Sequence, residues 1–176
     1  QRGVILRAAD LQVGGLQLQR KVLGVELSRG RDFRLSFLQV AKLGQHLKYD
    51  RHIFANYGIT LGGIEHSGVI DDTLLQSYVL EAHESHELGN LTTRHVGLAT
   101  ISYDDVTGKG ASRIGFEQVA VEQASEYAAE DADVTLRVRD ALAPQIAASD
   151  KLEFVYRQIE LPVAAILFRM ERTGVL

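Results

Sequence analysis

The chain has 176 residues, 45% of them hydrophobic, and a net charge of −4. This fits one domain, or one domain with a piece of a neighbour, and the hydrophobic content is enough for a core. No apolar run is long enough to cross a membrane, and the absence of cysteine excludes disulfides and thiolate metal sites, which suits a reducing cytosol.

The charge is unevenly distributed. Residues 1–49 carry nine Lys or Arg against three Asp or Glu, whereas residues 50–176 carry ten against twenty. This difference in charge suggests that residues 1–49 have a different origin or role from the rest of the chain. The charge of the acidic residues 50–176 does not by itself suggest a nucleic-acid partner. The start lacks both an initiator methionine and the apolar length of a signal peptide, so we expect a fragment of a longer chain.

The first forty residues mix short apolar runs with Arg, Gln and Gly. Residues 4–6, 22–27 and 33–38 have the composition of strands, and the turn at 28–32 makes the last two a hairpin. A helix over 16–27 is the alternative.

From residue 40 the pattern sharpens. It predicts a strand over 40–45, a helix over 47–57 closed by Gly58, and helices over 74–80 and 90–96. Residues 99–117 are typical of a loop, with a breaker at 107–110. Apolar residues at threes and fours predict a long helix over 119–146, and a last helix should run from Pro162 to Gly174. Strands interleaved with helices indicate an α/β or α+β fold with a mixed sheet.

Two polar spots lie at helical spacing. His46 and Asp50 are four apart at a strand-to-helix junction, and Tyr127 and Asp131 are four apart in an acidic part of the long helix. A carboxylate at either place could bind a divalent cation. Taken alone, Asp50 is equally a first-turn carboxylate favoured by the helix dipole, Tyr127 a core residue, and the acidic run a solvated face.

Together, and in this order, the segments 45–50 and 127–133 resemble the 3′→5′ proofreading exonuclease domain of the bacterial DNA polymerase I family, a member of the DEDD exonucleases. Segments 48–51, 55–59, 72–80 and 108–110 support the resemblance. Segments 159–162 and 169–175 resemble the entry to the polymerase domain. The resemblance covers about residues 42–176.

The resemblance implies a site for two ions, Mg²⁺ or Mn²⁺, which prefer oxygen ligands. Asp50 matches a ligand of the outer metal, and Asp131 matches a ligand of the metal that holds the attacking water. Tyr127 matches the tyrosine that orients this water. Gln45 and His46 match positions near the terminal phosphates, where the family often has Asn in place of His46.

The resemblance also implies that the partner is the single-stranded 3′ end of DNA. It further implies that the domain belongs to a polymerase of replication and repair, which is cytoplasmic and associated with the nucleoid. Tyr103 falls where an aromatic side chain stacks near the frayed 3′ base. The fold implied is α/β of the ribonuclease H-like exonuclease type, with a mixed sheet flanked by helices. We expect a divergent segment at 1–41, the exonuclease domain at 42–148, and a linker with the first helix of the same chain's polymerase domain at 149–176.

Two features depart from the family. Its first motif, Asp-x-Glu, is absent before Asp50, where the acids are Asp10, Glu26 and Asp32. Without it the metals should bind weakly, so a catalytically inactive domain with a structural or single-stranded-DNA-binding role is the alternative function. Segment 67–71 resembles an insertion before Asp72.

Other polar residues carry weaker expectations. His83 and His86 are one residue short of a zinc-helix spacing. Arg51, Arg137 and Arg139 are expected to be solvated, with Arg51 a lesser candidate for a phosphate contact. Glu130 and Asp133 are expected to support the site or lie on the surface.

Overall fold

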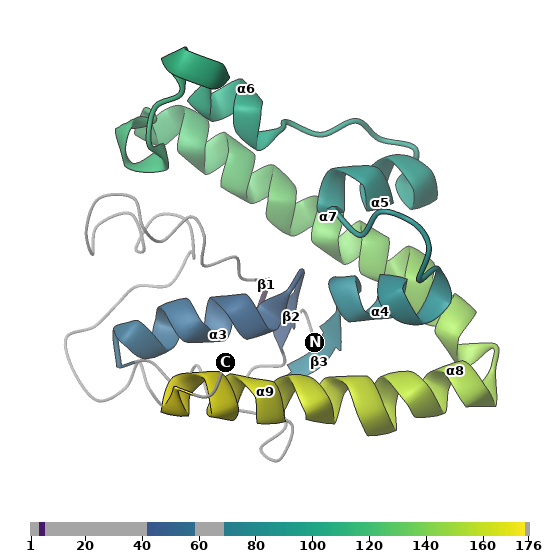
Figure 1. Ribbon diagram of the computed structural model, residues 1–176. Coiled ribbons are helices and arrows are strands. Elements are labelled where there is room, and N and C mark those ends of the chain that lie inside the picture. Colours follow the sequence, from purple (N-terminus) through teal and green to yellow (C-terminus); the bar gives the residue numbers. More distant parts are fainter. Residues whose placement is uncertain (1–3, 6–41, 59–68, 175–176) are drawn as a thin grey trace.

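The computed structural model describes residues 4–5, 42–58 and 69–174. It is mostly helical around a small sheet of strand order β1-β2-β3 (Figure 1). Strand β2 (Lys42–Gly44) pairs in parallel with β1 (Val4–Ile5) and with β3 (Val69–Asp72). Every pairing among the described residues is parallel, so the expected mixed sheet is not confirmed. The hairpin expected over 22–38, and its helical alternative, lie outside the described residues.

The helices predicted after residue 40 are present. They are α3 (Leu47–Asn56), α4 (Thr73–Leu80), α5 (Leu88–Val96) and α7 (Val121–Ala147). Gly58, predicted to close the first of them, has φ 70° and donates its N–H to the Ala55 carbonyl. Glycine adopts this left-handed conformation without the steric cost that a side chain brings.

The prediction of a loop over 99–117 is wrong in one part, because α6 (Tyr103–Thr107) and two short 3₁₀ turns lie there. Ser102 caps α6: its hydroxyl accepts from the Asp105 N–H at 3.2 Å, and the Asp105 carboxylate accepts from the Ser102 N–H at 2.8 Å. This reciprocal pair is a capping box with Asp in the place that Glu or Gln usually takes.

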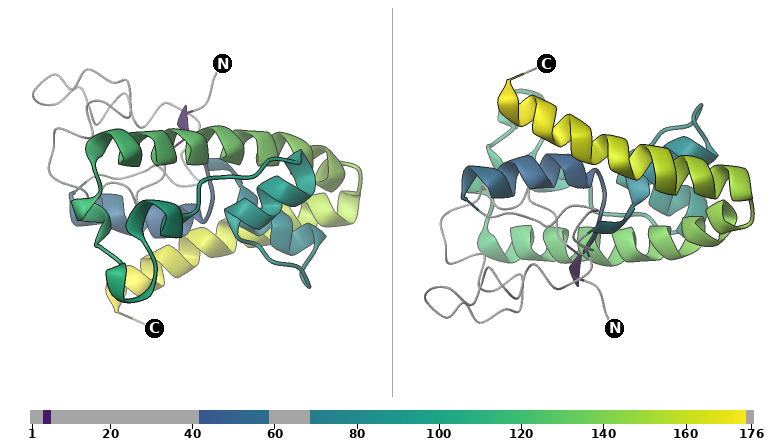
Figure 2. Two further views of the ribbon diagram at one scale, coloured as in Figure 1. Left: turned by 90° about the horizontal axis from the view of Figure 1, so that it is seen from above. Right: turned by 90° about the horizontal axis from the view of Figure 1, so that it is seen from below.

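Helix α7 is the longest element, and the other layers pack along it (Figures 1 and 2). Helices α4 and α5 lie against its C-terminal half, and α6 lies near its N-terminal end. The core between α5 and α7 consists of apolar side chains that are almost fully buried: Leu88, Leu91, Val134, Val138 and Leu142. Burial of this kind fixes α7 as a rigid support for the side chains on its other faces.

The C-terminal part is one nearly continuous helical path. Helix α8 (Asp150–Phe154) leads through a π-helical stretch (Val155–Glu160) into α9 (Leu161–Thr173), which ends at Gly174 with φ 98°. Helix α9 lies beside α3 in both views of Figure 2. There the Glu171 carboxylate accepts hydrogen bonds from Lys48 and, at 2.7 Å, from His52. In the described part of the chain, no helix is both long and apolar enough to cross a membrane.

Candidate functional site

One large cavity, of ≈ 1010 Å³, opens among α3, α4, α6 and α7. The side chains to which the family resemblance gave a role in catalysis, metal binding or DNA binding all line it: Gln45, His46, Asp50, Tyr103, Tyr127 and Asp131. They come from three regions that are far apart in the chain. The fold therefore brings the predicted site residues together around one hollow.

The cavity begins where β2 ends and α3 starts. Between them His46 adopts the left-handed conformation, with φ 62° and ψ 48°, and its own side chain makes no capping hydrogen bond. This conformation is unusual for a residue with a side chain and persists only where the surroundings hold it. A carboxylate from the neighbouring strand does so.

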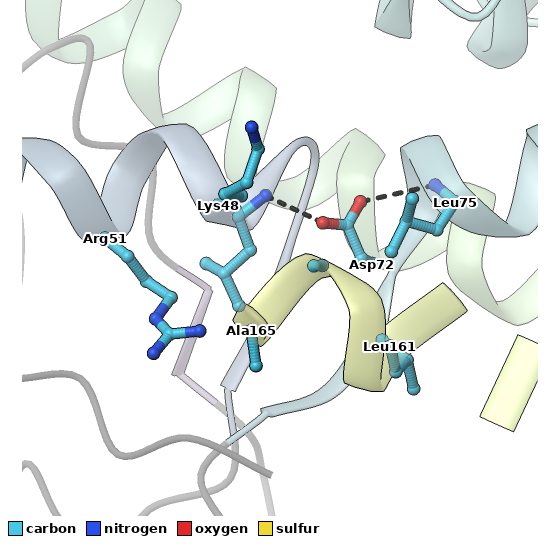
Figure 3. Close-up of a pocket in the computed structure, with 8 residues that line it drawn as sticks. Lys48, Arg51, Asp72, Leu75, Leu161 and Ala165 are labelled. Atoms are coloured by element: carbon cyan, nitrogen blue, oxygen red, sulfur yellow. Dashed lines mark hydrogen bonds between the residues drawn. The ribbon is translucent and has the colours of Figure 1, made fainter. Parts of the chain in front are cut away.

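That carboxylate is Asp72, at the end of β3, which stands opposite Gly44 in the sheet. One oxygen accepts from the N–H of Leu47 at 2.8 Å, and the other accepts from the N–H of His46 and of Leu74, both at 3.0 Å. The second oxygen also accepts a longer bond from Leu75 at 3.4 Å (Figure 3). Asp72 thus caps α3 and α4 together.

The capping carboxylate is only 3% exposed. Burial raises the pKa of Asp72, and the four backbone N–H donors act against that rise. The positive ends of two helix dipoles meet at the same point and favour the anion. Asp72 lies in one of the segments that support the family resemblance, but no local pattern reveals its capping role, because α3 is brought to it only by the pairing of β2 and β3.

The Gln45 amide is held at both ends by the protein. Its Nε2 donates to the His86 carbonyl at 2.8 Å, and its Oε1 accepts from the Thr73 hydroxyl. Gln45 is 7% exposed, while His46 beside it is exposed. Of the two, His46 has the freer side chain for a ligand, and Gln45 ties the segment before α5 to the cavity wall.

The two predicted metal ligands are both nearly buried carboxylates on this cavity. Asp50 is 2% exposed and Asp131 is 4% exposed. Their oxygen chemistry suits Mg²⁺ or Mn²⁺. Within residues 4–5, 42–58 and 69–174, however, no three Asp, Glu, His or Cys side chains gather where they could hold an ion. The described residues fit a cation in ligand type, and their number falls short of what two ions need.

Tyr127 lies one turn before Asp131 on α7. Its side chain packs in the core on one side and lines the cavity on the other. Its ring meets the Phe116 ring edge-on at 5.9 Å, in a cluster that also contains Val106 and Val119. A ring that is fixed by packing holds its hydroxyl at a defined place on the cavity wall.

Tyr103 presents an aromatic face at the cavity rim. It is 45% exposed, and its ring stacks on Phe116 at 5.8 Å with an interplanar angle of 20°. The Arg113 guanidinium lies 5.9 Å from the Tyr103 ring centre, and the same arginine pairs with Asp104. The ring is therefore supported from the core side.

The polar lining is acidic. Asp50, Glu87, Asp104 and Asp131 line the cavity, and none of the described lining residues is Lys or Arg. Such a wall does not attract phosphates through direct ion pairs. A nucleic acid bound here must gain its affinity from stacking, from polar contacts and from cations.

A second carboxylate, Asp71, is 0% exposed and joins the strand end to the C-terminal helices. It accepts from Arg139 at 2.8 Å and from the Tyr156 hydroxyl at 3.1 Å, and Arg157 lies 3.2 Å away. The Tyr156 hydroxyl also accepts from the Asp72 N–H at 2.9 Å. Burial and the negative charge of Asp71 raise the pKa of Tyr156, which stays protonated.

This network corrects the expectation that Arg139 is solvated. The hydrogen bond to Asp71 raises the pKa of Arg139 and holds its guanidinium in place. Arg137, in contrast, lies on the exposed face and pairs with Asp133 at 2.7 Å, as a solvated residue should. No signal within α7 separates the two arginines, since the partner of Arg139 lies 68 positions away.

The weaker candidates take other roles. The Arg51 guanidinium lies 4.2 Å from the Phe168 ring centre on α9, and Arg51 borders a small pocket of ≈ 20 Å³ with Asp72 (Figure 3). Arg51 is not among the residues that line the large cavity, so the structure does not place it where the terminal phosphates are expected. Glu130 accepts from the Ile101 N–H at 2.7 Å and so fixes the segment before α6.

The chain is similar to known proteins over most of its length. Residues 35–147 match the family model described as 3′-5′ exonuclease. DNA polymerase I of Pseudomonas aeruginosa is 38% identical over 182 residues, which is 99% of this chain and 20% of that protein. DNA polymerase I of Rhizobium leguminosarum is 41% identical over 137 residues, which is 77% of this chain and 13% of that protein.

A third relative, DNA polymerase I of Bacillus subtilis, is 35% identical over 115 residues, which is 64% of this chain and 12% of that protein. The chain thus spans about a fifth or less of the length of these curated relatives. The similarity to the Pseudomonas protein extends into the residues before 42, where the sequence alone led us to expect none.

Proposed function

The chain belongs to the 3′-5′ exonuclease family that its residues 35–147 match, and we propose that its cavity binds the 3′ end of a DNA strand and releases the terminal nucleotide. The observation that carries this proposal is the convergence of Asp50, Tyr127 and Asp131 on one cavity. We further propose a ribonuclease H-like fold, with residues 42–148 as the exonuclease domain. Residues 149–176 would then be a linker and the first helix of a polymerase domain in a parent chain for replication and repair.

Each cavity residue has a proposed task. Tyr103 would take the terminal base on its exposed ring, and His46, with the Gln45 segment behind it, would meet the terminal phosphates. Tyr127 would orient a water by hydrogen bonding from its fixed ring, so that the water faces the phosphorus. The acidic wall would keep other phosphates from settling in the hollow.

Enzymes of this family generally depend on divalent metal ions. Asp50 and Asp131 would hold such an ion, for which their oxygens are suitable ligands. When bound, the ion supplies activation of water and stabilisation of the leaving oxygen. Because both carboxylates are nearly buried, a bound cation would offset part of the cost of keeping negative charge away from water.

A second function has an observation of its own. Among the described residues, no three metal-ligating side chains gather where they could hold one ion, and the chain has no Asp-x-Glu before Asp50. This favours a domain that binds single-stranded 3′ ends without cutting them. The two functions differ only in hydrolysis, so binding and cleavage have to be measured separately.

The test is digestion of a 5′-labelled single strand in Mn²⁺, comparing the chain with Asp131→Asn and with Asp133→Asn. Asp131→Asn should lower the cleavage rate about a hundredfold or more, because a metal ligand is lost. Asp133→Asn, on the exposed face of the same helix, should leave it unchanged. Binding is measured by fluorescence anisotropy in EDTA. Equal background cleavage in all three chains, with binding retained, contradicts hydrolysis and supports the second function.

A further inference from the structure

Tyr78 is an aromatic side chain on the cavity wall that the function above does not use. It belongs to α4, is 50% exposed and lines the same cavity as Tyr103, which lies on α6. Exposed tyrosines are common on protein surfaces and need no explanation by themselves. Tyr57 is of that kind: it is 58% exposed at the end of α3 and is not among the cavity residues.

What distinguishes Tyr78 is the support behind its ring. The His86 ring packs against it with a centroid separation of 3.6 Å and an interplanar angle of 31°. His86 is itself fixed, because its Nδ1 lies 2.7 Å from the Ser77 hydroxyl and its carbonyl accepts from Gln45. A ring held in this way loses little further freedom when a flat ligand stacks on it.

Helix α4 is equally constrained at its start. Asp72 caps it, and the helix packs against α7. Tyr78 and Tyr103 are thus two supported aromatic faces, each about half exposed, on different elements around one hollow. The wall between them is acidic, so flat aromatic faces are the most effective contacts that it offers to a nucleic acid.

We propose that Tyr78, backed by His86, is a second base-binding subsite of this cavity, which takes a nucleobase of the single strand upstream of the 3′-terminal base. The inference rests on the proposed function, since the cavity must first bind a strand. Stacking on Tyr78 would select single-stranded over paired ends, because a base inside a duplex has both faces stacked on its neighbours and has none to offer. It would also let the site accept any base, since every base has a π-face.

The sequence makes the test direct, because the chain contains no tryptophan. Tyr78→Trp places a single indole at the subsite, and Tyr57→Trp places one outside the cavity. We expect oligo(dT) in EDTA to quench the emission of Tyr78→Trp and to leave that of Tyr57→Trp unchanged. Anisotropy with labelled oligo(dT) should give about tenfold weaker binding for Tyr78→Leu and near wild-type binding for Tyr78→Phe.

Abasic scanning assigns the contact to a base. A single abasic site is moved along the oligonucleotide, and the loss caused by Tyr78→Leu is measured at each position. The loss should disappear at one internal position only, because the base that stacks on Tyr78 is missing there. Matching urea midpoints for Tyr78→Leu and the wild type establish that the variant is folded, as expected for a half-exposed side chain.

Three results overturn the subsite: wild-type affinity for Tyr78→Leu, an equal loss at every abasic position, or a loss that disappears at the 3′-terminal base. If the wild type binds and Tyr103→Leu weakens binding while Tyr78→Leu does not, the subsite falls and the proposed function stands. If the wild type binds no oligonucleotide, both fall together.

Discussion

The double cap formed by Asp72 leads to a quantitative prediction about stability. Asp72→Ala removes the acceptor for the first N–H groups of α3 and of α4. Loss of the α4 cap costs about 1 kcal/mol. Loss of the α3 cap leaves the buried Leu47 N–H without its acceptor, which costs about 1–3 kcal/mol.

Removal of the Asp72 carboxylate also stabilises the folded state in one respect, because a buried charge no longer has to be kept away from water. Burial raises the pKa of Asp72, which means that desolvation of the charge opposes the hydrogen bonds. The two losses sum to about 2–4 kcal/mol, and we expect a net loss of about 2 kcal/mol, toward the lower end, out of a total stability of roughly 5–15 kcal/mol. Asp72→Asn keeps one oxygen and turns an NH₂ toward the donors of one helix, so it should cost about half as much.

The measurement is urea unfolding followed by circular dichroism, with the midpoint and the m value both fitted. Asp133→Ala is the matched control, because Asp133 forms only an exposed pair with Arg137 and should matter by about 0.5 kcal/mol or less. The double cap is refuted if Asp72→Asn is as stable as the wild type, or if Asp72→Ala resembles the control.

Two ion pairs give further predictions. Hydrogen bonds from Lys48 and His52 lower the pKa of Glu171 below its ordinary value of 4.5. The stability that these bonds add is therefore fully present above pH 4.5, and it is lost as the pH falls through the lowered pKa of Glu171. The urea midpoints of the wild type and Glu171→Gln should differ near pH 6 and converge toward about pH 3; a constant difference contradicts the pairing. Arg139→Met should cost about 2–4 kcal/mol in the same assay, because the buried Asp71 loses a charge partner, and an effect below about 0.5 kcal/mol would show that Arg157 suffices.

Local sequence patterns predicted the helices well because the signals that start and stop them lie within a few residues. Gly58 ends α3 and Gly174 ends α9, both with positive φ, as the sequence indicated. The segment around Ser102 was missed for a chemical reason, since its capping box uses Asp105 where the usual pattern has Glu or Gln. The start of α9 was placed near Pro162, but a π-helical stretch continues the helical path before it.

The contacts that the sequence could not predict join residues that are far apart. Arg137 and Arg139 lie on opposite sides of α7, since two residues span about 200° of a helix, and only the position of Asp71 at the end of β3 shows which of them is bound. Similarly, the spacing of His83 and His86 was only a weak signal for a metal and gave no other role, whereas in the structure His86 lies behind Tyr78 and His83 is exposed. Such pairings depend on which strands become neighbours, and no local pattern encodes this.

The site residues were identified from the family resemblance, and the register of strands β2 and β3 explains how the structure holds them in place. Strands β2 and β3 run in parallel and end side by side, with Gly44 opposite Asp72. The residue after each strand end therefore lies at one edge of the sheet, where α/β proteins bind their ligands. Asp72 uses this adjacency to fix the left-handed turn at His46 and the start of α4, and α4 carries Tyr78. One buried carboxylate thus sets the position of cavity walls on two helices, and a change there should alter the DNA binding that we propose, even though Asp72 itself does not line the cavity.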